Sequence, residues 1–277
     1  LIDGERGLPG YSKSNIYNIR WSHSQDSKAN PYNRFSASVN LGSSNYFRES
    51  LNQINTPNFL NNTLNSSVSF SKTFRGYPSV NISLTASHSQ NTRSKTVNLV
   101  LPTFQGNVER VYPFVKKNGQ KKGFFKNINL QYSFRGENRI NTTDSLFFKK
   151  GMFDDAKYGM KHSIPVSTNF KVLKHLSVSM NGNFDEIWTG NTINRTDYNI
   201  SSQQQSEKIK IKGFDRFNQY NFGMSVGTTI YGLFNFKENS KIQSIRHVIR
   251  PSVSYNIRPS FKKYYDTYII DADGNTA

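Results

Sequence analysis

The chain has 277 residues, and only 35% of them are hydrophobic, against about 45–50% in an average globular domain. Aromatic residues nevertheless make up 14%, which excludes a disordered chain, and the net charge of +18 predicts anionic surroundings. The absence of cysteine excludes disulfides and thiol chemistry in this chain. No apolar run approaches the roughly 18 residues of a membrane helix.

Alternation of apolar and polar residues is the dominant pattern, and it predicts about ten β-strands. In chain order, we expect them at 17–22, 34–41, 67–71, 80–87, 95–101, 128–135, 159–170, 176–184, 220–230 and 245–257. In each strand, one face is apolar and the other carries mainly Ser, Asn and Thr. The side chains expected on the apolar face include Tyr17, Ile19, Leu84, Leu130, Tyr132, Val178 and Phe222.

The predicted connections alternate between short and long. Short ones fall at 25–32, 74–78, 172–175 and 237–241, and long ones at 43–63, 138–158 and 189–216. The short connection 90–94 and the long connection 103–124 break this rule.

Many of the strands reach the about 9–11 residues that a tilted strand needs to cross a bilayer. Soluble sheets usually carry Lys and Glu on the polar face, where this chain has Ser and Asn. We therefore predict an all-β protein, an antiparallel transmembrane β-barrel of the outer-membrane type, with 1–277 as part of one barrel domain. The first ten residues do not resemble a signal peptide, so we expect a signal removed earlier or an internal piece of a longer protein.

No residue cluster predicts catalysis, a cofactor site or a metal site. The acidic pairs Asp154–Asp155 and Asp185–Glu186 are expected to be solvated or to bind a divalent ion, and the five histidines lack metal-ligand spacing. Asp271 begins a DADGN sequence that resembles the start of a calcium loop, but it lacks the later ligands, which favours a tight turn.

Basic residues are the more informative polar groups. Arg20, Arg34 and Arg135 fall on the polar faces of predicted strands. Two interpretations fit these arginines equally well. One is a solvated lining, and the other is contact with phosphates and acidic sugars, which Arg binds by charge-assisted hydrogen bonds. Lys208, Lys210 and Lys212 fall in a predicted connection, where solvation is the simpler explanation. Nucleic acid is disfavoured as a partner because no recognition helix or single-strand motif is present.

The stretch Arg246–Tyr255 reads RHVIRPSVSY, so that His247, Pro251, Tyr255 and then Pro259 recur at intervals of four residues. This pattern resembles a strand motif of the LptD family of lipopolysaccharide-assembly barrels. Three further stretches are similar to the middle of that barrel: WSHSQDSKANPYNRFSASVNLGSSNYF, NTPNFLNNTLNSSVSFSKTF and KHSIPVSTNFK. The resemblance extends from about Asn15 to Tyr265.

The resemblance implies an outer-membrane translocon component, not an enzyme, that inserts lipopolysaccharide into the outer leaflet of the Gram-negative envelope. The implied partners are lipopolysaccharide, a lipoprotein plug of the LptE type, outer-membrane lipids, and periplasmic Lpt bridge proteins that meet a jellyroll domain not expected in this chain. The family's disulfide cysteines are missing. Pro251 is expected to mark a bulge or the membrane boundary of its strand, because proline cannot donate a ladder hydrogen bond.

Two other functions fit the same residues. One is a porin or nutrient-transporter barrel of the outer membrane, which in the plugged transporters would have a plug domain upstream. The other is a soluble adhesin built of β-sandwiches, which detergent-free extraction would reveal. A jellyroll domain upstream would favour lipopolysaccharide translocation.

Overall fold

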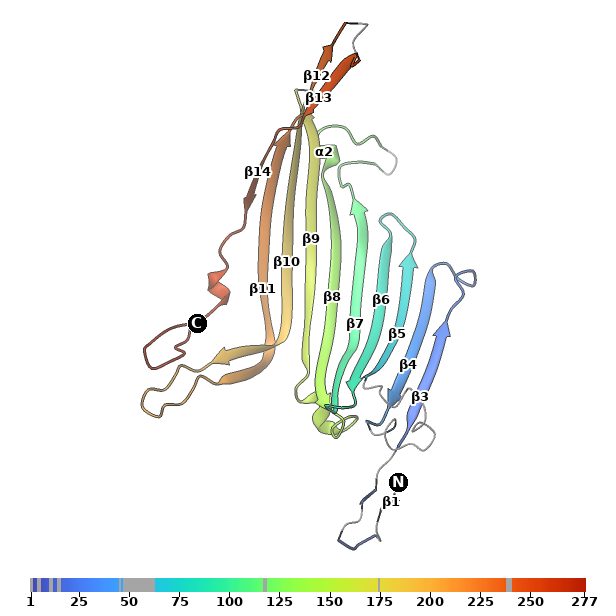
Figure 1. The fold of residues 1–277 in the computed structure, drawn as a ribbon, viewed down its shortest axis with the longest axis vertical. Coiled ribbons are helices and arrows are strands. Elements are labelled where there is room, and N and C mark those ends of the chain that lie inside the picture. The colour runs from blue at the N-terminus through green and yellow to red at the C-terminus, as the bar shows by residue number, and fades with distance from the viewer. Residues whose placement is uncertain are drawn as a thin grey trace.

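The computed structural model is built on one antiparallel sheet of ten strands, drawn as a single curved layer in Figure 1. It describes residues 2–3, 6–9, 12–13, 16–44, 46, 63–116, 119–173, 175–237 and 241–277. The sheet order is β14-β11-β10-β9-β8-β7-β6-β5-β4-β3, so all neighbours are also sequence neighbours except β11 and β14. The predicted all-β antiparallel class and the number of strands are confirmed. Strands β3 and β14 form the two edges, so the sheet is open.

The ten strands differ greatly in length. Their bounds are β3 (Asn18–Ser24), β4 (Asn33–Gly42), β5 (Thr63–Phe74), β6 (Val80–Asn91), β7 (Thr96–Val111), β8 (Asn129–Thr143), β9 (Lys157–Val172), β10 (Leu176–Arg195), β11 (Lys208–Gly227) and β14 (Ser252–Ile257). Two hairpins add to them: β1 (Ile2–Asp3) with β2 (Ser12–Lys13), and β12 (Ile230–Asn235) with β13 (Ser244–Ile249). The helical pieces are α2 (Phe124–Asn127), η2 (Lys150–Phe153) and η3 (Lys262–Tyr264). In the described part of the chain, no helix has the length and apolar character needed to cross a membrane.

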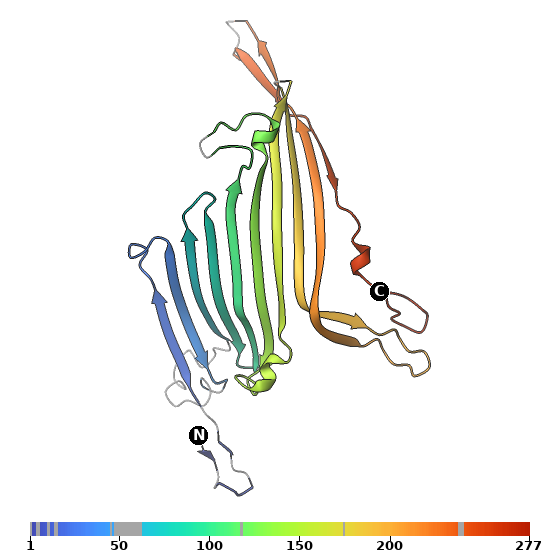
Figure 2. The ribbon, with the colours of Figure 1, turned by 180° about the vertical axis from the view of Figure 1, so that it is seen from behind.

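The sheet has two distinct ends (Figures 1 and 2). The turn end carries the connections 25–32, 75–79, 112–128 and 173–175 together with the projecting β12–β13 hairpin. The loop end carries the connections 92–95, 144–156 and 196–207. Most of the predicted long connection 43–63 lies outside the described residues.

Strand pairing separates the side chains into an apolar face and a polar face. Cross-strand partners point to the same side, and the register pairs Ile19 with Leu41, Leu84 with Phe104, and Val178 with Val226. Followed from strand to strand, this register places Leu130, Tyr132 and Phe222 on that same apolar face. The predicted facing of these residues is confirmed, except that Tyr17 lies just before β3.

Local hydrogen bonds explain where several strands reverse. Asn30 Oδ1 accepts hydrogen bonds from the backbone N–H groups of Tyr32 and Asn33 at the turn before β4. Asn91 Oδ1 accepts from Arg93 and Ser94 in the turn between β6 and β7. Such Asx turns satisfy backbone donors where the ladder stops, so a short connection suffices even at the loop end.

The predicted long connection 103–124 is wrong, because β7 continues to Val111. Pro102 interrupts the alternation in the sequence, and the pairing shifts register between Val100 and Thr103 to accommodate it. Beyond this bulge the alternation resumes, with Phe104 and Val108 on the apolar face. The connection is therefore 112–128.

Two other predicted connections are shorter than expected, because the strands continue through charged residues. Strands β8 and β9 extend to Thr143 and from Lys157, which leaves 144–156 in place of 138–158. Met152 of this connection is buried against Val97, Leu99 and Ile140 on the apolar face. In the same way, the connection between β10 and β11 is 196–207 and not the predicted 189–216. Lys208, Lys210 and Lys212 therefore lie on a strand rather than in a connection.

The predicted strand 245–257 is split in two. Strand β13 pairs with β12, whereas β14 pairs with β11, and Arg250 and Pro251 lie between them. The strand is interrupted here because Pro251 has no N–H to donate to the ladder. The Pro251 carbonyl still accepts a hydrogen bond from Thr228 N at 3.1 Å. Pro251 therefore lies between two strands and not at a bulge within one, and its place at a membrane boundary stays a prediction. His247 therefore lies on β13 and Tyr255 on β14, while Pro259 follows β14.

Candidate functional site on the polar face

The three arginines singled out from the sequence lie far apart on the polar face. Arg20 pairs with Asn40 near the middle of β3, and Arg34 pairs with Ser71 near the turn end of β4. Arg135 lies on β8, four strands from β4, which corresponds to roughly 19 Å at the usual strand spacing. These three residues do not form one site, and only Arg135 lies in a cluster of cations.

A cationic hollow of about 680 Å³ surrounds Arg135 at the loop end of the polar face. We use this name for the hollow whose charged lining consists of Arg135, Arg139, Lys157, Lys161, Lys208 and Lys210, with Glu137 among them. Apolar residues such as Ile187 and Ile193 line the rest of it. Strand alternation places Arg135, Glu137 and Arg139 on one face of β8, and β9 and β11 supply the lysines.

Two cross-strand pairs in the hollow carry like charges. Arg139 is directly opposite Lys157, and Arg135 is directly opposite Lys161. Directly opposed like charges destabilise a sheet. Their presence therefore favours a role for the hollow other than stabilising the fold.

Acidic residues balance only part of this charge. Glu137 lies 3.1 Å from Arg135 Nη2 and 2.8 Å from Arg139 Nε. Lys161 pairs with Asp185 at 3.1 Å, and Lys210 lies 3.7 Å from Asp155. Within the described ranges, Lys157 and Lys208 have no carboxylate at ion-pair distance. The hollow thus has positive charge available for an anion.

A polar track leads across the same face to the hollow. It is a groove of about 610 Å³ lined largely by neutral polar side chains of β5 to β9, among them Ser71, Asn81, Ser83, Asn107 and Ser133. Arg135 and Lys161 line both the track and the hollow, so the two are continuous. The track begins beside the connection 75–79 at the turn end. The track and the hollow together therefore extend from the turn end towards the loop end.

The sequence prediction missed Arg139, Lys157 and Lys161. A signal was present, because Arg135, Glu137 and Arg139 continue the period-two alternation beyond Phe134. The predicted strand ends at Arg135, whereas β8 continues through Glu137 and Arg139 to Thr143. The pairing of β8 with β9, which brings Lys157 opposite Arg139, could not be read from either segment alone.

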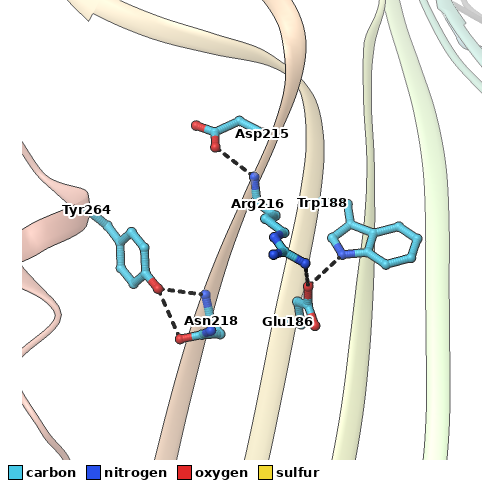
Figure 3. A network of polar contacts seen from close by, with 6 residues as sticks. All are labelled: Glu186, Trp188, Asp215, Arg216, Asn218 and Tyr264. Carbon is cyan, nitrogen blue, oxygen red and sulfur yellow. Dashed lines mark hydrogen bonds and ion pairs between the residues drawn. The ribbon is translucent and has the colours of Figure 1, made fainter.

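The apolar face carries a row of polar groups towards its loop end, seen in part in Figure 3. Trp188 Nε1 donates to Glu186 Oε1 at 3.0 Å, and Arg216 Nη1 lies 3.7 Å from the same oxygen. Tyr264 donates its hydroxyl proton to Asn218 Oδ1 at 3.0 Å. On the neighbouring strands, Tyr132 Oη lies 2.7 Å from His162 Nδ1. On the loop-end side of these contacts, the apolar face continues with Leu99 and Ile140.

The candidate metal motifs form ordinary turns or ion pairs. Asp271 accepts hydrogen bonds from the backbone of Asp273 and Asn275 and from the Asn275 amide, which lowers its pKa, so the predicted tight turn is confirmed. Asp185 and Glu186 point to opposite faces of β10. No group of three or more His, Asp or Glu residues able to hold a metal ion occurs in the described part.

The fold and the site together define an all-β protein with one antiparallel sheet, an exposed apolar face and a basic polar face. The chain belongs to the LptD protein family, whose model matches residues 1–276. Members of this family are components of lipopolysaccharide transport. No curated protein and no solved structure matches the chain. The resemblance to this family seen in the sequence is thus confirmed.

Proposed function

We propose that the chain is part of the wall of an outer-membrane β-barrel that inserts lipopolysaccharide into the outer leaflet. Its sheet would close into a barrel with further strands added at the open edges of β3 and β14. The apolar face would then contact lipid and the polar face would line the lumen, as in barrels of the outer membrane.

The cationic hollow at the end of the polar track is the observation that carries this proposal. Neutral Ser and Asn side chains can exchange hydrogen bonds with sugars without fixing one pose. At the loop end, Lys157 and its neighbours would meet the phosphates of the headgroup by charge-assisted hydrogen bonds. Each contact is exposed and therefore weak, which suits a substrate that must leave. Arg20 and Arg34 would add transient contacts outside the hollow.

The partners follow from this function. A lipoprotein of the LptE type would occupy the lumen against the polar face, and periplasmic bridge proteins would deliver lipopolysaccharide at the turn end. In this orientation the loop end faces the cell exterior, because outer-membrane barrels have short periplasmic turns and longer outer loops. No catalysed reaction and no cofactor is required.

Depletion of the protein in its host tests the proposal. Newly made lipopolysaccharide should fail to reach surface label, while uptake of small solutes stays unchanged. A porin or nutrient transporter would show the reverse, with normal surface arrival and lost uptake, and that result would overturn the proposal.

A further inference from the structure

We propose that the apolar face carries a binding groove for one acyl chain of a phosphorylated glycolipid of the outer leaflet. This aromatic groove has a volume of about 350 Å³ and is separate from the cationic hollow. It lies on the opposite face of the sheet, between Phe104 of β7 and Phe214 of β11. The inference rests on the proposed function for the orientation that places the loop end outside.

Glycines form the floor of the groove. Gly136, Gly159 and Gly190 all line it. Gly136 pairs with Met160 on the apolar face, whereas Gly159 pairs with Glu137 and belongs to the polar face. The Tyr158 ring lies directly over Gly190, where a Cβ atom would collide with it. The floor is therefore covered by Tyr158 at Gly190 and open at Gly136, where a hydrocarbon chain can approach the backbone.

The walls are almost entirely apolar. Phe104, Met160, Trp188 and Phe214 line the groove, with the rings of Trp188 and Phe214 6.0 Å apart edge to face. Of these, Phe214 is 71% exposed, so its ring is free to contact a lipid. Burying such surface against a hydrocarbon chain is favourable, although lipid tails in general would cover any apolar face.

A charged group beside the groove decides which lipid fits. Arg216 is the cross-strand partner of Trp188, so it lies one strand spacing from the groove wall. Its side chain is 72% exposed, and its single ion pair among the described residues is the long contact with Glu186 (Figure 3). A guanidinium placed beside a Trp on an apolar surface suits a phosphate at the lipid–water boundary.

Filling the floor of the groove tests this inference in the full-length protein. In Gly136→Leu, the new Cβ would lie 3.6 Å from Met160 Cγ, an ordinary contact, and the rest of the side chain would occupy the groove. The matched control is Gly182→Leu, on the same face, where the nearest atom lies at 3.6 Å and no groove is filled. The measurement is the lipopolysaccharide retained per protein after detergent extraction, read by native mass spectrometry.

Gly136→Leu should lower the retained lipopolysaccharide roughly tenfold, as expected from lost contact with about two methylene groups. Gly182→Leu should retain the normal amount. Equal retention in both variants and the parent, or equal loss in both, would overturn the inference. If surface delivery of lipopolysaccharide is normal in that case, the proposed function stands and only the groove fails.

A second measurement covers the case in which Gly136→Leu does not fold. A benzophenone amino acid in place of Phe214 should crosslink to lipopolysaccharide several-fold more than one in place of Trp21, an exposed residue of the same face on the edge strand β3, four strands from the Phe104 wall of the groove. Equal yields at the two positions, or a product at Phe214 that contains phospholipid and no glycolipid, would contradict the inference.

Discussion

At the scale of single residues, the charges of the polar face work against the stability of the sheet. Lys157 lies opposite Arg139, and no carboxylate in the described part neutralises it. Arg135 and Lys161 repeat the arrangement, partly relieved by Glu137 and Asp185. A sheet optimised for stability would place opposite charges at these positions. The proposed anionic substrate would account for this departure.

This reasoning gives a prediction for Lys157→Ser. Removing one charge of a like-charged pair should raise the free energy of unfolding by about 0.2–1 kcal/mol, while delivery of lipopolysaccharide to the surface should slow. Unfolding titrations and surface labelling measure the two effects. Lys171→Ser is the matched control, since Lys171 is exposed on the same face of β9 but lies near the turn end. Unchanged delivery in Lys157→Ser would argue against a substrate role for the hollow.

A second residue-scale prediction concerns Gly106 on the apolar face. The Phe134 ring packs directly on this glycine, and a Cβ atom would lie 2.5 Å from ring atom Cε1. Gly106→Ala should therefore lower the free energy of unfolding by about 1–3 kcal/mol, as overpacking does. Gly182→Ala should be nearly neutral, since its nearest neighbour is 3.6 Å away. Equal stability of the two variants would show that Phe134 moves aside without cost.

At the scale of the element, the alternation in the sequence predicted the strands and their faces well. It worked for β6 because one face must be apolar along the whole strand, so that a register shift by one residue would put polar residues on that face. For β8 and β10 the predicted strand ends too early, and for β11 it begins too late, because charged residues continue the polar face. It also missed the second half of β7, where Pro102 and a bulge interrupt the period.

The candidate site was harder to predict than the strands. Arg135 was correctly predicted to lie on the polar face, but Arg20 and Arg34 are several strands away from it. The residues that do surround Arg135 come from β8, β9 and β11. Their proximity depends on the stagger between strands, which is set by pairing and bulges rather than by any local pattern. The aromatic groove was missed for the same reason.

The two faces of β10 give a prediction at this scale. Met180 lies near the middle of the apolar stretch, paired with Thr168 and Met224, whereas the neighbouring Ser179 is exposed on the polar face. In a lipid bilayer, Met180→Arg should lower the free energy of unfolding by about 2–4 kcal/mol, and Ser179→Arg should be tolerated. The measurement is refolding into vesicles of defined composition. The opposite order would mean that the assignment of faces is wrong.

At the scale of the whole molecule, the open edges and the long central strands describe a wall rather than a complete container. Strands β10 and β11 each have 20 residues, about twice what a tilted strand needs to cross a bilayer. Their loop-end parts bend away from the sheet, as Figure 1 shows, beyond the register shift at Thr189. These parts would project beyond the membrane and carry Lys208 and Lys210 with them.

Closure into a barrel predicts a simple behaviour on gels. The full-length protein, extracted in detergent, should migrate faster before boiling than after, because a closed ladder resists unfolding by the denaturing detergent. Extraction without detergent, or identical migration before and after boiling, would favour a soluble sheet protein and contradict the barrel.

Cysteine scanning along β10 in intact outer membranes tests the central claim most directly. The chain contains no cysteine, so each substitution adds one thiol to it. Cysteines that replace Ser177, Ser179, Asn181 and Asn183 should react with a water-soluble maleimide, because they would line a wet lumen. Cysteines that replace Met180 and Phe184 should be protected by lipid. Uniform reactivity along the strand, or the reversed alternation, would contradict a membrane wall with an aqueous polar face.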